Sequence, residues 1–186
     1  MSSNAREAIL EAAKRTAQAH GYGGLNFREL AKEVGIKGAS IHYYYPTKAE
    51  LGAAVAKRYW QDSDVVLETL WAECGDPASF LHAYPATFRK ALENDNRMCL
   101  CSFMSAELDD LPEEVKTEVL AFADVNVKWL AKALMSVGSL DVEQSHRRAR
   151  AIFAAISGAQ LTARSRSDIA IFDSLVETYR ESGLIP

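Results

Sequence analysis

Apolar residues recur along this chain at spacings of three and four, the pattern of one face of an α-helix. Glycine, proline or a capping Asn, Asp, Ser or Thr separates one such segment from the next, and no segment alternates strictly like a strand. Helices are expected at about residues 5–20, 26–34, 38–45, 47–70, 76–92, 97–108, 112–138, 142–163 and 168–182. The pattern therefore predicts an all-α protein of about nine helices, with Pro85 kinking the fifth.

The segment from Asn26 to Lys48 is predicted to form two short helices around a turn. Asn26 is a good N-cap, and Glu29, three residues later, completes a pair that resembles a capping box. Gly35 ends the first helix, because glycine tolerates the left-handed conformation of many helix C-termini. Pro46 ends the second helix. The segment is therefore expected to be a helix pair joined by a glycine-bearing turn.

The second of these helices has an outward face that is unusual for a solvent-exposed surface. Ile41 and Tyr45 point inward, whereas the opposite side carries a hydroxyl and two large aromatic rings, in the series Ser40, Tyr43, Tyr44 and Thr47. No acidic residue lies between Lys37 and Lys48. Hydroxyl groups, aromatic edges and lysines suit the major groove of DNA, where they meet phosphates, base edges and thymine methyls. The alternative is a capped helical hairpin whose tyrosines only cover a small core.

The same segment resembles the helix-turn-helix of the tetracycline-repressor (TetR/AcrR) family of bacterial regulators. The matching residues are Phe27–Arg28–Glu29–Leu30–Ala31, Val34–Gly35–Ile36, Ser40–Ile41–His42–Tyr43–Tyr44–Tyr45, and Lys48 through Leu51. The likeness covers about residues 5–55 closely and the remainder only in length and helicity. Gly38 and Ala39 are small where many members carry a base-reading side chain, and His42 stands where tyrosine is usual. These departures leave the operator sequence open.

The predicted DNA contacts lie on and beside the second short helix. They are Arg28, Lys37, Gly38, Ala39, Ser40, His42, Tyr43, Tyr44, Thr47 and Lys48. Lys37, Thr47 and Lys48 are assigned to phosphates. Arg28 and Tyr43 are assigned to bases, and His42 to either. The helix at residues 5–20 completes a three-helix head, whose partner is a double-stranded DNA operator.

The charge of the chain is divided between its two parts. Residues 1–48 hold seven Lys/Arg and four Asp/Glu, a balance of +3, whereas residues 49–186 hold fourteen and twenty-one, a balance of −7. The overall charge of −4 argues against a protein that coats nucleic acid in general. We therefore expect a DNA-binding domain at residues 1–48 and a helical domain for ligand binding and dimerisation at residues 49–186.

Two late helices carry stripes that predict a dimer interface. The stripes consist of Ala151, Ala155, Gly158 and Thr162, and of Ile169, Phe172, Val176 and Tyr179. Small residues let another helix approach closely, and two such helices with a symmetry copy would form a four-helix interface. A dimer also places two heads on a pseudo-palindrome, and the family resemblance implies the same assembly. The alternative is that both stripes face their own core.

The middle helices are rich in aromatic rings and sulfur, which predicts a pocket for a small apolar or aromatic effector. The predicted lining is Tyr59, Trp60, Phe80, Tyr84, Phe88, Cys99, Phe103, Met104, Phe122, Trp129 and Gln160, with Tyr84, Cys99 and Gln160 supplying polar contacts. The alternative is a filled core. The family resemblance implies a cavity whose ligand shifts the helix at 47–70, respaces the two heads and releases a repressor from DNA.

Two other functions are weighed against this one. Cys99-x-Cys101 could sense oxidants or electrophiles, as in some family members, but Met98, Leu100 and Phe103 predict buried and inert thiols. An architectural DNA-binding dimer without an effector would instead have a filled core and many genomic sites.

Catalysis finds no support, because the four histidines have no partner at the spacing of a metal site or triad. We expect no enzyme activity, cofactor or metal. The absence of an N-terminal apolar segment and of a stretch long enough to cross a bilayer predicts a cytoplasmic protein with no membrane partner.

Overall fold

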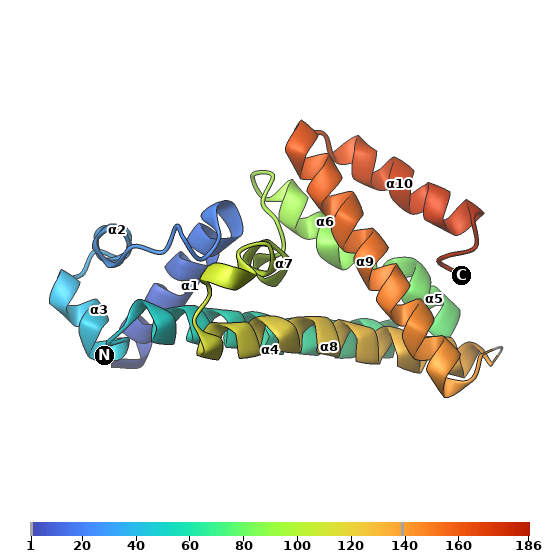
Figure 1. Ribbon diagram of the computed structural model, residues 1–186, viewed down its shortest axis with the longest axis horizontal. Coiled ribbons are helices and arrows are strands. Elements are labelled where there is room, and N and C mark those ends of the chain that lie inside the picture. Colours follow the sequence, from blue (N-terminus) through green and yellow to red (C-terminus); the bar gives the residue numbers. More distant parts are fainter. Residues whose placement is uncertain (1, 139) are drawn as a thin grey trace. The chain divides into compact units, whose positions relative to one another are not determined.

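A computed structural model describes residues 2–138 and 140–186, and the described residues form helices and no strands (Figure 1). The α-helices are α1 (Ser2–His20), α2 (Phe27–Val34), α3 (Gly38–Tyr44), α4 (Lys48–Cys74), α5 (Pro77–Ala83), α6 (Ala86–Glu93), α7 (Leu100–Ser105), α8 (Glu113–Val137), α9 (Val142–Arg166) and α10 (Ile169–Glu181), with a 3-10 helix, η1, at Leu108–Asp110. The predicted all-α class is confirmed. One expected helix is divided into α5 and α6, because Pro85 cannot donate a backbone hydrogen bond and begins the second piece.

The helices form two compact units. Unit 1 contains Met1–Gln61 and Leu100–Phe122, and unit 2 contains Asp62–Cys99 and Ala123–Pro186. The long helices α4 and α8 therefore each contribute to both units. This compact division does not follow the expected boundary at residue 48, because α7 packs on α1 and belongs to unit 1. The assignment of functions to residues 1–48 and 49–186 stays a prediction.

The core of unit 1 is built around α1, α2 and α3. Ile9, Leu30 and Ile41 are fully or almost fully buried, and Tyr45, which follows α3, lies beside them. Phe27 and Val34 of α2 are only half-buried. The short helices α2 and α3 therefore hold their positions through one apolar side each, which leaves their other sides exposed.

The core of unit 2 lies among α5, α6, α9 and α10. Figure 1 shows α9 and α10 side by side, in orange and red, and α10 also contacts α6. Asp141 begins α9 with a full capping box, and Asp168 begins α10 by accepting the Ala170 N–H. The cap at Asp141 agrees with the sequence, in which either Ser167 or Asp168 could begin the last helix, and the structure assigns that cap to Asp168.

Candidate functional site

The turn between α2 and α3 is shaped by its capping residues. The Asn26 side chain accepts hydrogen bonds from the backbone N–H groups of Arg28 (2.9 Å) and Glu29 (3.3 Å). Gly35 ends α2 in the left-handed region with φ 74°, where other residues are strained. A Cβ at Gly35 would meet nothing within 4 Å, so the conformation alone favours glycine. The predicted helix-turn-helix is confirmed in this geometry.

The outward side of α3 is open to solvent. Tyr43 is 80% exposed, and its ring makes an edge contact with the half-buried Tyr44 at 5.1 Å between centroids. Gly38 and Ala39 are exposed, and Ser40 is half-buried. The reverse side carries Ile41, which is buried completely. The helix thus anchors through one face and presents the other, as the sequence predicted.

Three further residues of the helix-turn-helix were predicted to contact DNA. His42 is exposed, with its ring 4.8 Å from that of Phe27 and its Nδ1 3.3 Å from the Pro46 carbonyl oxygen. Lys37 and Arg28 are exposed, and no acidic side chain in residues 2–138 or 140–186 pairs with either of them. Lys37 is the N-cap residue of α3, and Arg28 lies in the first turn of α2. Exposed cations without an acidic partner are side chains of the kind that bind phosphates and base edges.

Thr47 and Lys48 are already engaged within the chain. The Thr47 hydroxyl accepts the Glu50 N–H (3.1 Å) and donates to the Glu50 carboxylate (3.2 Å), so it caps α4. Lys48 donates to the Gly23 carbonyl oxygen (3.2 Å), with its ammonium 4.6 Å from the Tyr22 ring centroid. Both side chains therefore position α4 and the turn before α2, and a phosphate would compete with these contacts.

The side chain of Glu107 also binds the turn before α2, a contact that was not predicted from the sequence. Its carboxylate accepts the N–H groups of Tyr22 (2.6 Å) and Gly23 (3.1 Å). Gly21 has φ 68°, and a Cβ there would overlap the Glu107 carboxylate and lie 2.6 Å from the Phe103 ring. The glycines indicate a turn in the sequence, but Glu107, which binds the turn, lies 84 residues after Gly23.

The predicted effector residues are divided between the two units. Tyr59, Trp60, Phe103, Met104 and Phe122 belong to unit 1, whereas Phe80, Tyr84, Phe88, Cys99, Trp129 and Gln160 belong to unit 2. In unit 1, Trp60 Nε1 donates to Glu118 (2.7 Å), and the Tyr59 and Phe122 rings lie 5.5 Å apart. Met104 is completely buried.

In unit 2 the aromatic residues form a continuous cluster. The Phe80 ring lies 6.2 Å from that of Trp129 and 6.5 Å from that of Tyr84, which in turn lies 5.7 Å from Phe88. The Tyr84 hydroxyl donates to Asn126 Oδ1 (2.9 Å). Burial raises the pKa of Tyr84 well above its usual value, so the phenol stays a hydrogen-bond donor at neutral pH.

Gln160 uses both ends of its amide within this cluster. Its Nε2 donates to the Phe88 carbonyl oxygen (2.7 Å), and its Oε1 accepts the Cys99 N–H (3.0 Å). The side chain is fully buried. The amide predicted to contact an effector therefore joins α9 to α6 and to the residue before α7.

The cysteines are free thiols with different accessibility. Cys99 and Cys101 are buried, and Cys74 is half-buried. The burial of Cys99 and Cys101 agrees with the sequence-based expectation, and a buried thiol is shielded from oxidants and electrophiles.

The two predicted dimerisation stripes differ in exposure. On α9, Ala151, Gly158 and Thr162 are exposed and Ala155 is half-buried. The same side carries Ala154 and Leu161, the latter 54% exposed. On α10, Ile169 and Tyr179 are half-buried, whereas Phe172 and Val176 are buried in unit 2. The prediction needs correction for these last two, because they pack inside their own chain and cannot form an exposed surface.

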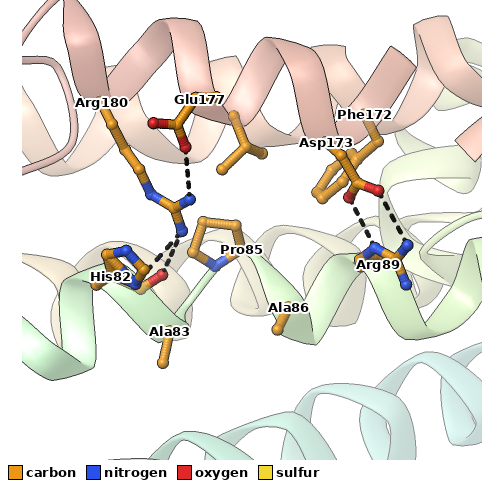
Figure 2. A pocket seen from close by; sticks show the side chains of 10 residues that line it. His82, Ala83, Pro85, Ala86, Arg89, Phe172, Asp173, Glu177 and Arg180 are labelled. Carbon is orange, nitrogen blue, oxygen red and sulfur yellow. Dashed lines mark hydrogen bonds and ion pairs between the residues drawn. The ribbon is translucent and has the colours of Figure 1, made fainter. Parts of the chain in front are cut away.

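A cleft of about 460 Å³ separates α10 from α5 and α6 (Figure 2). Two arginines bridge it. Arg89 donates from Nε and Nη2 to the Asp173 carboxylate (2.7 and 2.9 Å), and Arg180 donates to the His82 carbonyl oxygen (2.9 Å) and to Glu177 (3.1 Å). These contacts fasten α10 to the rest of unit 2, and the charges of the cleft are already paired.

Two further classes of site find no support in the described part of the chain. No group of three or more His, Cys, Asp or Glu side chains in it could hold a metal ion. None of its helices combines the length and the apolar character needed to cross a membrane.

Residues 9–55 match the family model of bacterial regulatory proteins of the tetR family. The whole chain is similar to a TetR-family transcriptional regulator from Agrobacterium tumefaciens, with 25% identity, 98% of each chain covered and a TM-score of 0.91. It is also similar to a TetR regulator from Legionella pneumophila, with 25% identity, 97% of this chain and 96% of that one covered, and a TM-score of 0.89.

Escherichia coli NemR, in its reduced form, shares the fold at 21% identity, with 98% of this chain and 97% of that one covered and a TM-score of 0.83. No curated protein sequence matches the chain. The helix-turn-helix geometry, the family match at residues 9–55 and the likeness over the whole chain together support a DNA-binding transcriptional regulator of the TetR family.

Proposed function

We propose that this regulator is a homodimeric repressor that binds a pseudo-palindromic operator and is released by a small apolar or aromatic effector. The observation that carries the proposal is the exposed side of α3, where Tyr43 projects into solvent while Ile41 anchors the reverse side. In this proposal Lys37 contacts phosphates and Arg28 contacts base edges. Gly38 and Ala39 let the helix backbone approach the groove closely, because neither has a side chain longer than a methyl group.

The salt dependence of DNA binding tests the role of the unpaired cations. Fragments selected from a random DNA pool supply the operator for the measurement. Lys37→Ala should lower the slope of log affinity against log salt by about one unit, with the same loss on every sequence. Lys90→Ala on α6 is the control, since Lys90 is an exposed lysine of unit 2. An unchanged slope for Lys37→Ala would contradict the assigned phosphate contact.

The dimer interface is proposed on the exposed side of α9. Gly158 supports this, because a Cβ there would meet nothing within 4 Å in the protomer. Packing within the chain therefore gives no reason for a glycine, whereas close approach of a second helix does. The half-buried Ile169 and Tyr179 of α10 are proposed to contribute as well, whereas Phe172 and Val176 are buried in their own chain.

The effector is proposed to bind among the aromatic side chains of the ligand-binding domain. The ligand must prefer the conformation that releases DNA, and a preference of about 100-fold corresponds to about 2.7 kcal/mol of coupling. Movement of α4 would respace the two heads. Besides α4, the hydrogen bonds of Glu107 to the turn before α2 connect the α7 region to the DNA-binding helices within unit 1.

Release of DNA separates this proposal from its alternatives. A screen of small apolar and aromatic molecules against the complex should find compounds that weaken DNA binding at least about tenfold. An architectural dimer would show no such response and would bind many genomic sites. A cysteine sensor is the other alternative, and the reduced form of NemR is among the similar structures. Such a sensor would no longer release DNA in response to oxidants or electrophiles when both Cys99 and Cys101 are replaced by serine. The burial of both thiols favours the apolar effector.

A further inference from the structure

A groove between α8 and α9 in unit 2 collects basic side chains. Its volume is about 480 Å³, within the range of small-molecule sites. Its lining residues are Ala123, Asp124, Val127 and Lys128 of α8 and His146, Arg150 and Phe153 of α9. Two cationic side chains and an imidazole thus face one carboxylate. The groove contains none of the residues that were predicted to line the effector pocket, and these predicted residues are called the effector core below.

The basic groups of this groove have no partner in the described part of the chain. Neither an ion pair nor a hydrogen bond there involves the side chain of Lys128, His146 or Arg150. The cleft in Figure 2 differs, because its arginines are paired with Asp173 and Glu177. Residues 49–186 carry a net charge of −7, so acids are abundant in this part of the sequence. The groove therefore concentrates positive charge that a bound anion would neutralise.

The spacing of the groove residues places the charges and the apolar surface together. Asp124 and Lys128 are four residues apart on α8, and His146 and Arg150 are four apart on α9, so each pair shares one side of its helix. Val127 and Phe153 supply the groove with apolar surface. The Phe153 ring is held by an edge contact with the buried Phe88, at 6.1 Å between centroids.

We propose that this groove binds an organic anion with an apolar portion. A carboxylate is the headgroup that fits best, because the Arg150 guanidinium can donate two parallel hydrogen bonds to it and Lys128 adds a point charge. The hydrocarbon portion lies on Val127 and Phe153. Asp124 disfavours dianions by repulsion, which selects a singly charged ligand. The site is separate from the proposed effector core and does not depend on it.

Octanoate is the probe that tests this site. Chemical-shift titration of the full-length, DNA-free protein at low salt compares octanoate with 1-octanol, its neutral counterpart, and with inorganic phosphate, an anion without an apolar portion. Octanoate should bind at least about tenfold more tightly than either. Arg150→Ala and Lys128→Ala should each weaken octanoate binding about threefold to tenfold, and the double variant should weaken it further. Arg147→Ala, an exposed arginine of α9 outside the groove, is the matched control and should bind like the unmodified protein.

Each other result overturns the proposal. Equal binding of octanol would show that the basic side chains do not select the ligand. Equal binding of phosphate would show that the apolar surface is not used. Octanoate binding that survives the double variant would place the ligand elsewhere, such as the aromatic core. Absence of octanoate binding at millimolar concentration would remove the site. None of these outcomes bears on DNA binding, so the proposed repressor function is tested independently of this site.

Discussion

The Glu107 carboxylate lies 2.6 Å from the backbone nitrogen of Tyr22, although the two residues are 85 positions apart in the sequence. It also accepts the Gly23 N–H, so one side chain that follows α7 satisfies two donors of the turn before α2. Lys48 holds the same turn through the Gly23 carbonyl oxygen. The turn that positions the helix-turn-helix is therefore fixed from two sides within unit 1.

Replacing Glu107 by alanine should destabilise unit 1 and weaken DNA binding. Two hydrogen bonds to a charged acceptor are lost, and we expect a cost of about 1–3 kcal/mol because the site is only half-buried. Asp109→Ala, which removes an exposed carboxylate two residues later, is the control. Urea unfolding and DNA affinity measure the two effects. Equal stability of Glu107→Ala and Asp109→Ala would show that the turn does not need this carboxylate.

Gln160→Met should destabilise unit 2 strongly. The change keeps the volume but leaves the buried Phe88 carbonyl oxygen and the Cys99 N–H without the partner they have in the structure. The expected loss is about 3 kcal/mol, since each buried unsatisfied group costs about 1–3 kcal/mol. Gln61→Met at an exposed position of α4 controls for the chemical change. Thermal unfolding temperatures that agree for the two variants would mean that Gln160 is not needed to join α9 to α6.

Ala154→Arg on the exposed side of α9 should convert the proposed dimer to a monomer while leaving the helical content unchanged. A long charged side chain would keep the two α9 helices apart, and it meets only solvent in the protomer because Ala154 is exposed. Ala72→Arg on α4 makes the same change at another exposed site. Light scattering gives the mass of each variant. If a double variant that combines Ala154→Arg with Leu161→Arg stayed dimeric, α9 would be excluded from the interface.

The contact between Arg89 and Asp173 predicts a pH-dependent contribution to stability. The hydrogen bond from the Arg89 guanidinium lowers the pKa of Asp173 below the usual aspartate value of about 3.9. The folded state thus favours the charged carboxylate, which contributes stability above the unfolded pKa and loses it as the pH falls through the folded pKa. Both side chains are partly exposed, so the contribution is at most about 1 kcal/mol.

Asp173→Asn should therefore be less stable than the unmodified protein at pH 7, and the difference should shrink toward pH 3. Urea unfolding at several pH values measures the difference, and Asp109→Asn serves as an exposed control without an arginine partner. A deficit that stays constant from pH 7 to pH 3 would mean that the contact with Arg89 is not responsible for it.

The sequence predicted the features whose signals are local. Asn26, Gly35 and Asp141 each act within a few residues of themselves, so the helix starts and ends at these positions could be derived without a structure. Pro85 likewise divides a helix through its own ring and missing N–H. The inward position of Ile41 and the outward position of Tyr43 followed from helical periodicity.

Contacts between distant segments could not be derived in this way. Periodicity shows which residues of α10 share a side, but not which neighbour that side meets, so Phe172 and Val176 were assigned to a partner and are buried in their own chain. Gln160 was assigned to a ligand because nothing near it in the sequence identifies Phe88 and Cys99 as its partners. Glu107 gave no local signal at all.

The central claim, that the exposed side of α3 binds DNA, is tested most directly with Tyr43→Ala. Because this side chain is 80% exposed, its removal should leave the unfolding temperature unchanged and weaken binding to a selected operator at least about tenfold. Leu120→Ala, at an exposed apolar position of α8, should change neither quantity. Fluorescence anisotropy with the operator gives the affinity. If Tyr43→Ala bound the operator as tightly as the unmodified protein, this side of α3 would not be the surface that meets DNA.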